Sequence, residues 1–168
     1  MTLYGLVAWP SPQLDGWLRE QQRRLGVAGY GPPHLNLRVP FTVTSGETEL
    51  TAGVRSLLEG VPPFTVAVGG WRIFPGVVFL GCNSPEVRQL HDLALELPGA
   101  PPQPHDQKEY IPHFTLALGV LPWARDALCR ELECLEPPVD SFPVSALSLL
   151  REGQGELHEV HTFPLERG

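Results

Sequence analysis

The sequence predicts a mixed α/β (α+β) fold made of two similar halves. Segments in which apolar and polar residues alternate, as in strands, are interspersed with longer segments of helical periodicity. One order of elements occurs twice: a strand, a helix, a strand that opens with histidine, a helix, a pair of prolines and a further strand. The two histidines, His34 and His113, lie nearly half of the 168-residue chain apart. This duplication predicts two pseudo-symmetric lobes, with mixed or antiparallel sheets and outer helices, around a central cleft.

The first half contains three expected strands and two expected helices. Ser11-Pro12 is typical of a helix start. Leucines at helical spacing follow it, and the glycine- and proline-rich stretch 26–33 then indicates a loop. The elements expected here are, in order, a strand at 2–9, a helix from Ser11-Pro12 to Leu25, a strand at 34–43, a helix at about 46–60 and a strand at 64–68.

The second half repeats this order. Ser84-Pro85-Glu86 again has the residues of a helix start. Five prolines in 98–112 indicate a loop within one domain, and we expect residues 1–168 to form a single domain. The expected elements are, in order, a strand at 77–80, a helix at 84–97, a strand at 113–120, a helix at about 122–135 and a final hairpin of strands at 142–150 and 157–165.

Composition limits the class of protein. A net charge of −7 argues against coating of long nucleic acid, which rests on many contacts between basic side chains and phosphates. No apolar run is long enough for a membrane span, and the first residues do not resemble a signal peptide. The three cysteines fit a reduced, cytosolic protein. We therefore expect a cytoplasmic, monomeric protein that does not bind membranes.

Each histidine strand has a polar face and an apolar face. Side chains two positions apart in a strand point to the same side, so His34, Asn36 and Arg38 are expected to share one face. His113 and Thr115 are expected to share the corresponding face of the other strand. The intervening leucines and phenylalanines are expected to form core. Duplication would then bring the two polar faces together.

Two imidazoles at one site are suited to acid–base cleavage of a phosphodiester. With an ordinary pKa of about 6.5, one ring can accept a proton from an attacking water while the other, protonated, gives its proton to the leaving oxygen. Asn36 and Thr115 could donate hydrogen bonds to phosphate oxygens, and Arg38 could hold a phosphate between its two amino groups. This scheme needs no metal and no cofactor, and the other histidines lack metal-ligand spacing.

At these residues the chain resembles a known family. Pro33–Leu37 and Ile111–Leu116 are similar to the paired His-x-Thr/Ser-x motifs of the 2H phosphoesterase superfamily, and above all to its bacterial 2′-5′ RNA ligase-like and cyclic phosphodiesterase branch. Phe-Pro-Gly at 74–76 and Val-x-x-Phe-Pro-Leu at 160–165 extend the resemblance along the chain.

The resemblance implies a bilobal fold with one motif from each lobe. It also implies opening of 2′,3′-cyclic phosphates to 2′-phosphates, and in some members reversible 2′-5′ joining of RNA ends. RNA ends or small cyclic nucleotides would be the substrates. By analogy, His34 would be the acid that protonates the leaving oxygen, and His113 the base that activates water.

Further residues are candidates for the rim of the cleft. Aromatic side chains often stack on nucleobases, which makes Tyr110, Phe74 and Trp71 candidates for base contacts. Arg72 and Lys108 are candidates for its charged edge.

Two alternatives remain open at this stage. Asn36 stands where the family usually has Thr or Ser, so a catalytically weak nucleotide- or RNA-binding protein on the same fold is one of them. The other is an unrelated α/β protein in which both histidines are structural.

Overall fold

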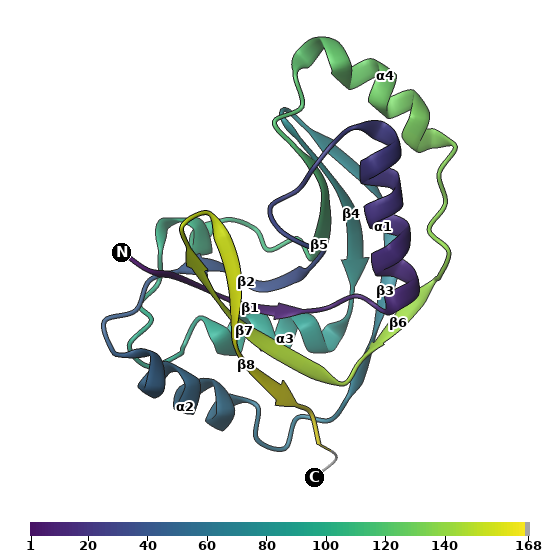
Figure 1. Ribbon diagram of the computed structural model, residues 1–168. Coiled ribbons are helices and arrows are strands. Elements are labelled where there is room, and N and C mark those ends of the chain that lie inside the picture. Colours follow the sequence, from purple (N-terminus) through teal and green to yellow (C-terminus); the bar gives the residue numbers. More distant parts are fainter. Residues whose placement is uncertain (167–168) are drawn as a thin grey trace.

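The computed structural model describes residues 1–166 and confirms the predicted α/β architecture (Figure 1). Eight strands form one curled sheet in the order β6-β3-β4-β5-β2-β1-β7-β8, and every pairing is antiparallel. The strands are β1 (Leu3–Ala8), β2 (Leu35–Phe41), β3 (Phe64–Phe74), β4 (Val77–Asn83), β5 (His113–Leu118), β6 (Ser141–Val144), β7 (Ala146–Gly153) and β8 (Glu156–Pro164). The helices are α1 (Pro12–Leu25), α2 (Glu47–Leu57), α3 (Pro85–Ala94), α4 (Pro122–Glu133) and the 3₁₀ helix η1 (Pro104–Gln107).

The sheet divides into two halves of four strands each. The halves join between β2 and β5, where the register pairs only Leu35 with Phe114. Figure 1 shows the strands of one half running at a steep angle to those of the other. The two histidine strands are therefore the innermost strands of their halves and meet at the junction.

Two helices each connect strands of one half of the sheet but pack against the other half. Helix α1, which connects β1 to β2, packs against β5 of the other half, and α3, which connects β4 to β5, packs against β2. The strand after α2 and the strand after α4 also meet, because β3 pairs with β6. Each half thus depends on elements from the other half of the sequence.

The apolar face of each histidine strand lies in the core, as predicted, except that Leu118 at the end of β5 is exposed. Leu35 and Leu37 on β2 and Phe114 and Leu116 on β5 have no exposed surface. At about 25 cal/mol per Å² of apolar surface, burying each such side chain contributes about 2 kcal/mol, which makes this packing the main force that fixes both strands.

Local signals place α1 as expected. The Ser11 hydroxyl accepts a hydrogen bond from the Leu14 backbone N–H, and Gly26 ends the helix with a φ of +66°. A left-handed residue at this position favours glycine, which has no Cβ to clash.

The final hairpin differs from expectation. The segment expected as one strand at 142–150 forms two, β6 and β7, which separate at Ser145. The first pairs with β3 in one half of the sheet and the second with β1 in the other, so the chain crosses between halves here. Among residues 1–166, no helix combines the length and apolar character that crossing a lipid bilayer requires.

Candidate functional site

The two histidines have the same local geometry. The Nδ1 atom of His34 lies 2.7 Å from the carbonyl oxygen of Pro32, and that of His113 lies 2.6 Å from the carbonyl oxygen of Ile111. A carbonyl only accepts, so Nδ1 carries the proton in both rings. Each Nε2 is then left to accept a proton when the ring is neutral, or to donate one when it is charged.

Burial shifts both imidazoles toward the neutral form. Desolvation lowers the pKa of His34, although the hydrogen bond to Pro32 acts against it. Desolvation also lowers the pKa of His113, against the hydrogen bond to Ile111, and repulsion from His34 lowers it further. This repulsion disfavours a state in which both rings are charged, so the pair is favoured to carry one proton.

Aromatic neighbours contact each imidazole. The indole of Trp9 lies edge-on to His34, with ring centroids 6.3 Å apart. The Phe79 ring lies against His113 with a centroid distance of 4.1 Å, and Phe74 stacks on Phe79 in turn. Both rings are thereby restricted in orientation, which general acid–base chemistry needs.

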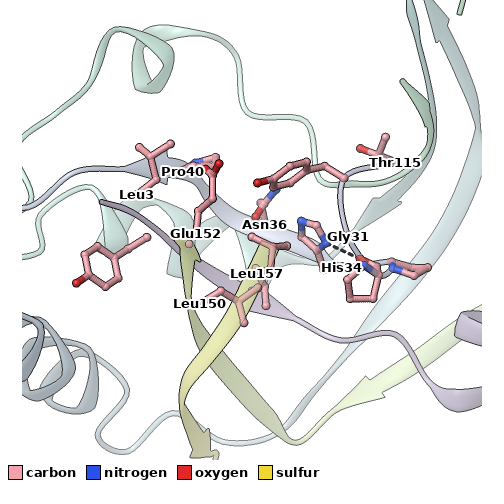
Figure 2. A pocket seen from close by; sticks show the side chains of 15 residues that line it. Leu3, Gly31, His34, Asn36, Pro40, Thr115, Leu150, Glu152 and Leu157 are labelled. Atoms are coloured by element: carbon pink, nitrogen blue, oxygen red, sulfur yellow. Dashed lines mark hydrogen bonds between the residues drawn. The ribbon is translucent and has the colours of Figure 1, made fainter. Parts of the chain in front are cut away.

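Two cavities flank the histidines. The first, the His34 cavity, encloses about 170 Å³, and its lining includes Tyr30, His34, Asn36, Thr115, Glu152 and Leu157 (Figure 2). The second, the His113 cavity, is more open, with about 480 Å³, and its lining includes Asn36, Phe74, Phe79, Lys108, Tyr110 and His113. Asn36 borders both cavities. Asn36 thus stands between a cavity lined by His34 and Thr115 and a cavity lined by His113.

Comparison with known proteins decides the family. The model of the 2′-5′ RNA ligase superfamily matches residues 10–156. An RNA 2′,3′-cyclic phosphodiesterase of Methanothermobacter thermautotrophicus is 30% identical over 131 residues, which cover 71% of this chain and 70% of that protein. The chain belongs to the 2′-5′ RNA ligase superfamily. The resemblance seen in the sequence is thus confirmed, and with it the phosphodiesterase class of enzyme.

Solved structures share the superfamily's fold. The crystal structure of TT0787 of Thermus thermophilus matches with a TM-score of 0.70 at 21% identity, covering 99% of this chain and 98% of that one. The structure of E. coli LigT complexed with 3′-AMP matches with a TM-score of 0.64 at 17% identity, covering 98% and 97%.

Arg38, which the sequence places among the phosphate-binding residues of this phosphoesterase, does not lie at the cavities. Arg38 is fully buried and lines neither cavity, so the prediction that it shares the face of His34 and Asn36 is wrong. The cause is two irregularities in the pairing of β2 with β1, where Val7 pairs with Asn36 but Leu6 pairs with Arg38. An extra residue in one strand reverses the alternation of faces beyond it.

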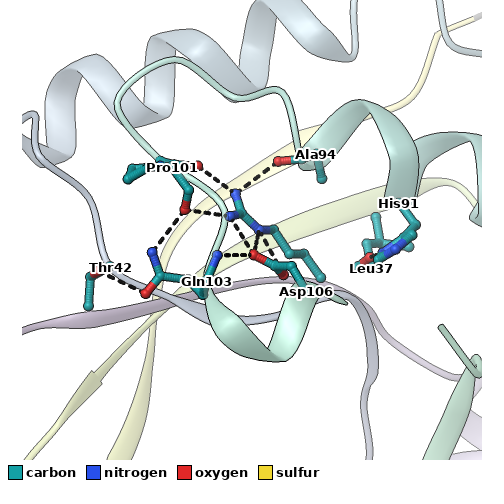
Figure 3. Close-up of polar contacts among 9 residues, drawn as sticks. Leu37, Thr42, His91, Ala94, Pro101, Gln103 and Asp106 are labelled. Atoms are coloured by element: carbon teal, nitrogen blue, oxygen red, sulfur yellow. Dashed lines mark hydrogen bonds and ion pairs between the residues drawn. The ribbon is translucent and has the colours of Figure 1, made fainter. Parts of the chain in front are cut away.

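The guanidinium of Arg38 instead fixes the loop before β5. Its Nη2 lies 2.8 Å from a carboxylate oxygen of Asp106 and also donates to the carbonyl oxygen of Pro101, while Nη1 donates to the carbonyl oxygens of Ala94 and Ala100 (Figure 3). Burial opposes ionisation of Asp106, but the hydrogen bond from Arg38 holds the pKa of that carboxyl below its usual range. Arg38 itself lines neither cavity, and its polar bonds go to the end of α3 and to the loop before β5.

The rim candidates divide into two groups. Phe74, Lys108 and Tyr110 line the His113 cavity. The Tyr110 ring is stacked on His91 and its hydroxyl donates to the backbone oxygen of Asn36 at 2.8 Å, so it supports the wall of the cavity.

Trp71 and Arg72 are not among the residues that line either cavity. Trp71 stacks on Trp17 and donates to the carbonyl oxygen of Leu135, while Arg72 is exposed. Both residues lie on β3, two strands away from β5 in the sheet, and of the three candidates on this strand only Phe74, at its end, reaches the His113 cavity.

Four residues at the site were not found from the sequence: Trp9, Tyr30, Phe79 and Glu152. Tyr30 precedes the Pro32-Pro33-His34 segment, and this proximity was an available signal. Glu152 lies on β7, more than 100 positions from His34, and only the pairing of β7 with β1 brings it to the cavity.

Proposed function

We propose that this protein opens 2′,3′-cyclic phosphodiesters of RNA ends or nucleotides to 2′-phosphates by two-histidine acid–base catalysis. The observation that carries the proposal is the matched pair His34 and His113, each held through Nδ1 by a backbone carbonyl, at the junction of the two halves. The related RNA 2′,3′-cyclic phosphodiesterase supports the same class of substrate.

In the proposed reaction, water attacks phosphorus while Nε2 of neutral His113 takes its proton. The bond from phosphorus to the 3′-oxygen breaks, and protonated His34 gives its Nε2 proton to that oxygen. Asn36 and Thr115 donate hydrogen bonds to the non-bridging oxygens as negative charge grows on them. The products are a 2′-phosphate and a 3′-hydroxyl, and the proton passes in net from water to the sugar.

Ligation follows from the same groups acting in reverse. A 5′-hydroxyl in place of water would attack the cyclic phosphate and give a 2′-5′ linkage. We therefore also propose that incubation with a 5′-hydroxyl oligonucleotide gives a small amount of joined product, set by the equilibrium between the two reactions.

The decisive experiment uses the full chain with a 2′,3′-cyclic nucleotide in the presence of EDTA, and identifies the product by ³¹P NMR. We expect the 2′-phosphate. His34→Ala and His113→Ala should each lower kcat by about 10²- to 10⁴-fold, the usual contribution of a general acid or base. His158→Ala, at an exposed position on β8, is the matched control and should leave the rate unchanged.

Other outcomes would contradict this proposal. Binding of the nucleotide without turnover would identify a catalytically weak binding protein. A 3′-phosphate as the product would show that the 2′-oxygen leaves instead. Retention of full activity in either alanine variant would exclude that histidine from the chemistry.

A further inference from the structure

The His34 cavity has two chemically different ends. Figure 2 shows His34 and Thr115 toward one end, and Leu3, Pro40 and Glu152 toward the other. Between them, the walls are largely apolar and include Leu150 and Leu157. A ligand that fills this cavity lengthwise therefore has one end at the proposed reaction centre and the other beside a carboxylate.

A carboxylate is electrostatically unfavourable in a site that binds an anion. In the part of the chain that the structure describes, Glu152 is the only acidic residue that lines the cavity, and no lysine or arginine there balances its charge. Among residues 1–166 it takes part in no salt bridge. Because like charges repel, a phosphate cannot lie at this end, and it is directed to the end with His34 and Thr115.

The group that satisfies a half-buried carboxylate is an N–H or O–H donor. The Tyr30 phenol lies near this carboxylate, which raises the pKa of the phenol. A ligand with N–H donors of its own could bind Glu152 in place of the phenol.

We propose that this end of the His34 cavity holds the nucleobase of the substrate, and that Glu152 selects bases by the N–H donors on their Watson–Crick edge, guanine above all. Guanine places two adjacent donors, N1–H and N2–H, opposite the two oxygens of one carboxylate. Uracil presents a single N–H between two carbonyl oxygens, which the carboxylate repels. Adenine and cytosine, with one amino group beside a ring acceptor, fall between these.

Local backbone structure keeps this part of the cavity open. Gly31 has a φ of +69°, and a Cβ placed on it would lie 2.8 Å from Cδ1 of Leu157. A side chain here would strain the backbone and force Leu157, which lines the cavity, to shift. In this proposal a flat base lies between the apolar side chains of Leu150 and Leu157 and the segment that contains Tyr30, with its edge toward Glu152. Other sites that recognise single nucleotides likewise contact the face and the edge of the base.

The test compares kcat/KM for the four 2′,3′-cyclic nucleotides, and it rests on the proposed function. We expect the wild-type protein to prefer the guanine substrate over the uracil substrate by about fivefold to a hundredfold, the usual value of one bidentate contact to a base. Glu152→Gln keeps the shape but replaces one acceptor oxygen by a donor, and it should remove the preference for guanine. Tyr30→Phe should retain it.

Glu109→Gln is the control for charge alone. Glu109 lines the His113 cavity on the other side of Asn36, so removing its charge should change the rates with all four nucleotides by a common factor. If Glu152→Gln also changed the rates with all four nucleotides by a common factor, Glu152 would act only through its charge. That result would overturn the inference.

The failures can be told apart. Lack of turnover with all four nucleotides contradicts the proposed function. Equal turnover of all four, or a guanine preference that survives in Glu152→Gln, leaves the function in place and shows that the base does not contact Glu152. If Tyr30→Phe lost the preference for guanine while Glu152→Gln kept it, Tyr30 would be the selecting residue. That result would likewise contradict the proposal.

Discussion

At Asn36 a single side-chain amide borders both cavities. We expect its N–H groups to stabilise the charge that develops on phosphate, so Asn36→Ala should lower kcat/KM by about 10²-fold, as loss of one such donor does elsewhere. Asn36→Thr should recover most of this loss, because a hydroxyl also donates. The measurement is steady-state hydrolysis of a cyclic nucleotide, and an alanine variant as active as the wild type would show that Asn36 does not contact the phosphate.

Residue type and spacing predicted the two histidines and their buried leucine and phenylalanine neighbours, since alternation along a strand is a local property. The predicted position of Arg38 was wrong because the sequence of residues 34–41 does not reveal an irregularity that depends on the pairing of β2 with β1. Glu152 was missed for a related reason. Its place in the His34 cavity depends on the register of β7 against β1, where Leu3 pairs with Glu152.

Among the elements, the loop between α3 and β5 depends on one buried ion pair. Arg38 and Asp106 are both almost fully buried, and removing one partner leaves the other charge uncompensated. We expect Arg38→Met to lower the free energy of unfolding by about 3–5 kcal/mol. Arg72→Met, at an exposed arginine, should change it by about 0.5 kcal/mol or less. Urea denaturation measures both, and equal effects would contradict this role of the pair.

The segment that follows β1 holds the His34 ring from the side. Trp9 donates to the buried Ser148 hydroxyl at 2.8 Å, and that hydroxyl hydrogen-bonds to Glu159. Trp9→Phe keeps an aromatic ring beside His34 but loses this tether. We expect kcat to fall about tenfold with little change in KM, because misplacement of a reacting group affects the chemical step.

The control for this prediction is Trp17→Phe. Trp17 also packs against an aromatic neighbour, because it stacks on Trp71, but neither cavity is lined by it. Its kcat and KM should both stay at the wild-type values. A rise in KM in Trp9→Phe with kcat unchanged would indicate a role in substrate binding rather than in positioning His34.

Across the whole molecule, helices and strands are exchanged between the two halves of the sheet. The repeat in the sequence does not reveal this exchange. The duplicated order of elements predicted two lobes, and this is correct. Which strand pairs with which is decided by long-range contacts, such as β3 with β6 and β7 with β1. The expected final strand at 142–150 was divided for this reason. Each half needs the other for its outer helix, so we expect the two halves to unfold in one cooperative transition.

The stability of the whole molecule should depend on pH through both histidines. Burial lowers the pKa of His34 and of His113 in the folded protein, while in the unfolded chain both titrate near the ordinary value of about 6.5. Below about pH 6.5 the unfolded state therefore binds more protons than the folded state. The free energy of unfolding falls as the pH is lowered through this window, by at most about 1.4 kcal/mol per pH unit for each group.

The measurement is urea denaturation between about pH 5 and 7.5, a window that lies above the range in which exposed carboxyl groups titrate. His34→Asn and His113→Asn combined remove both titrating groups, so the double variant should show a flatter dependence than the wild type. Because the two rings come from opposite halves of the sheet, each single variant should remove part of the slope. A double variant with the full wild-type slope would show that burial of these imidazoles does not couple folding to pH.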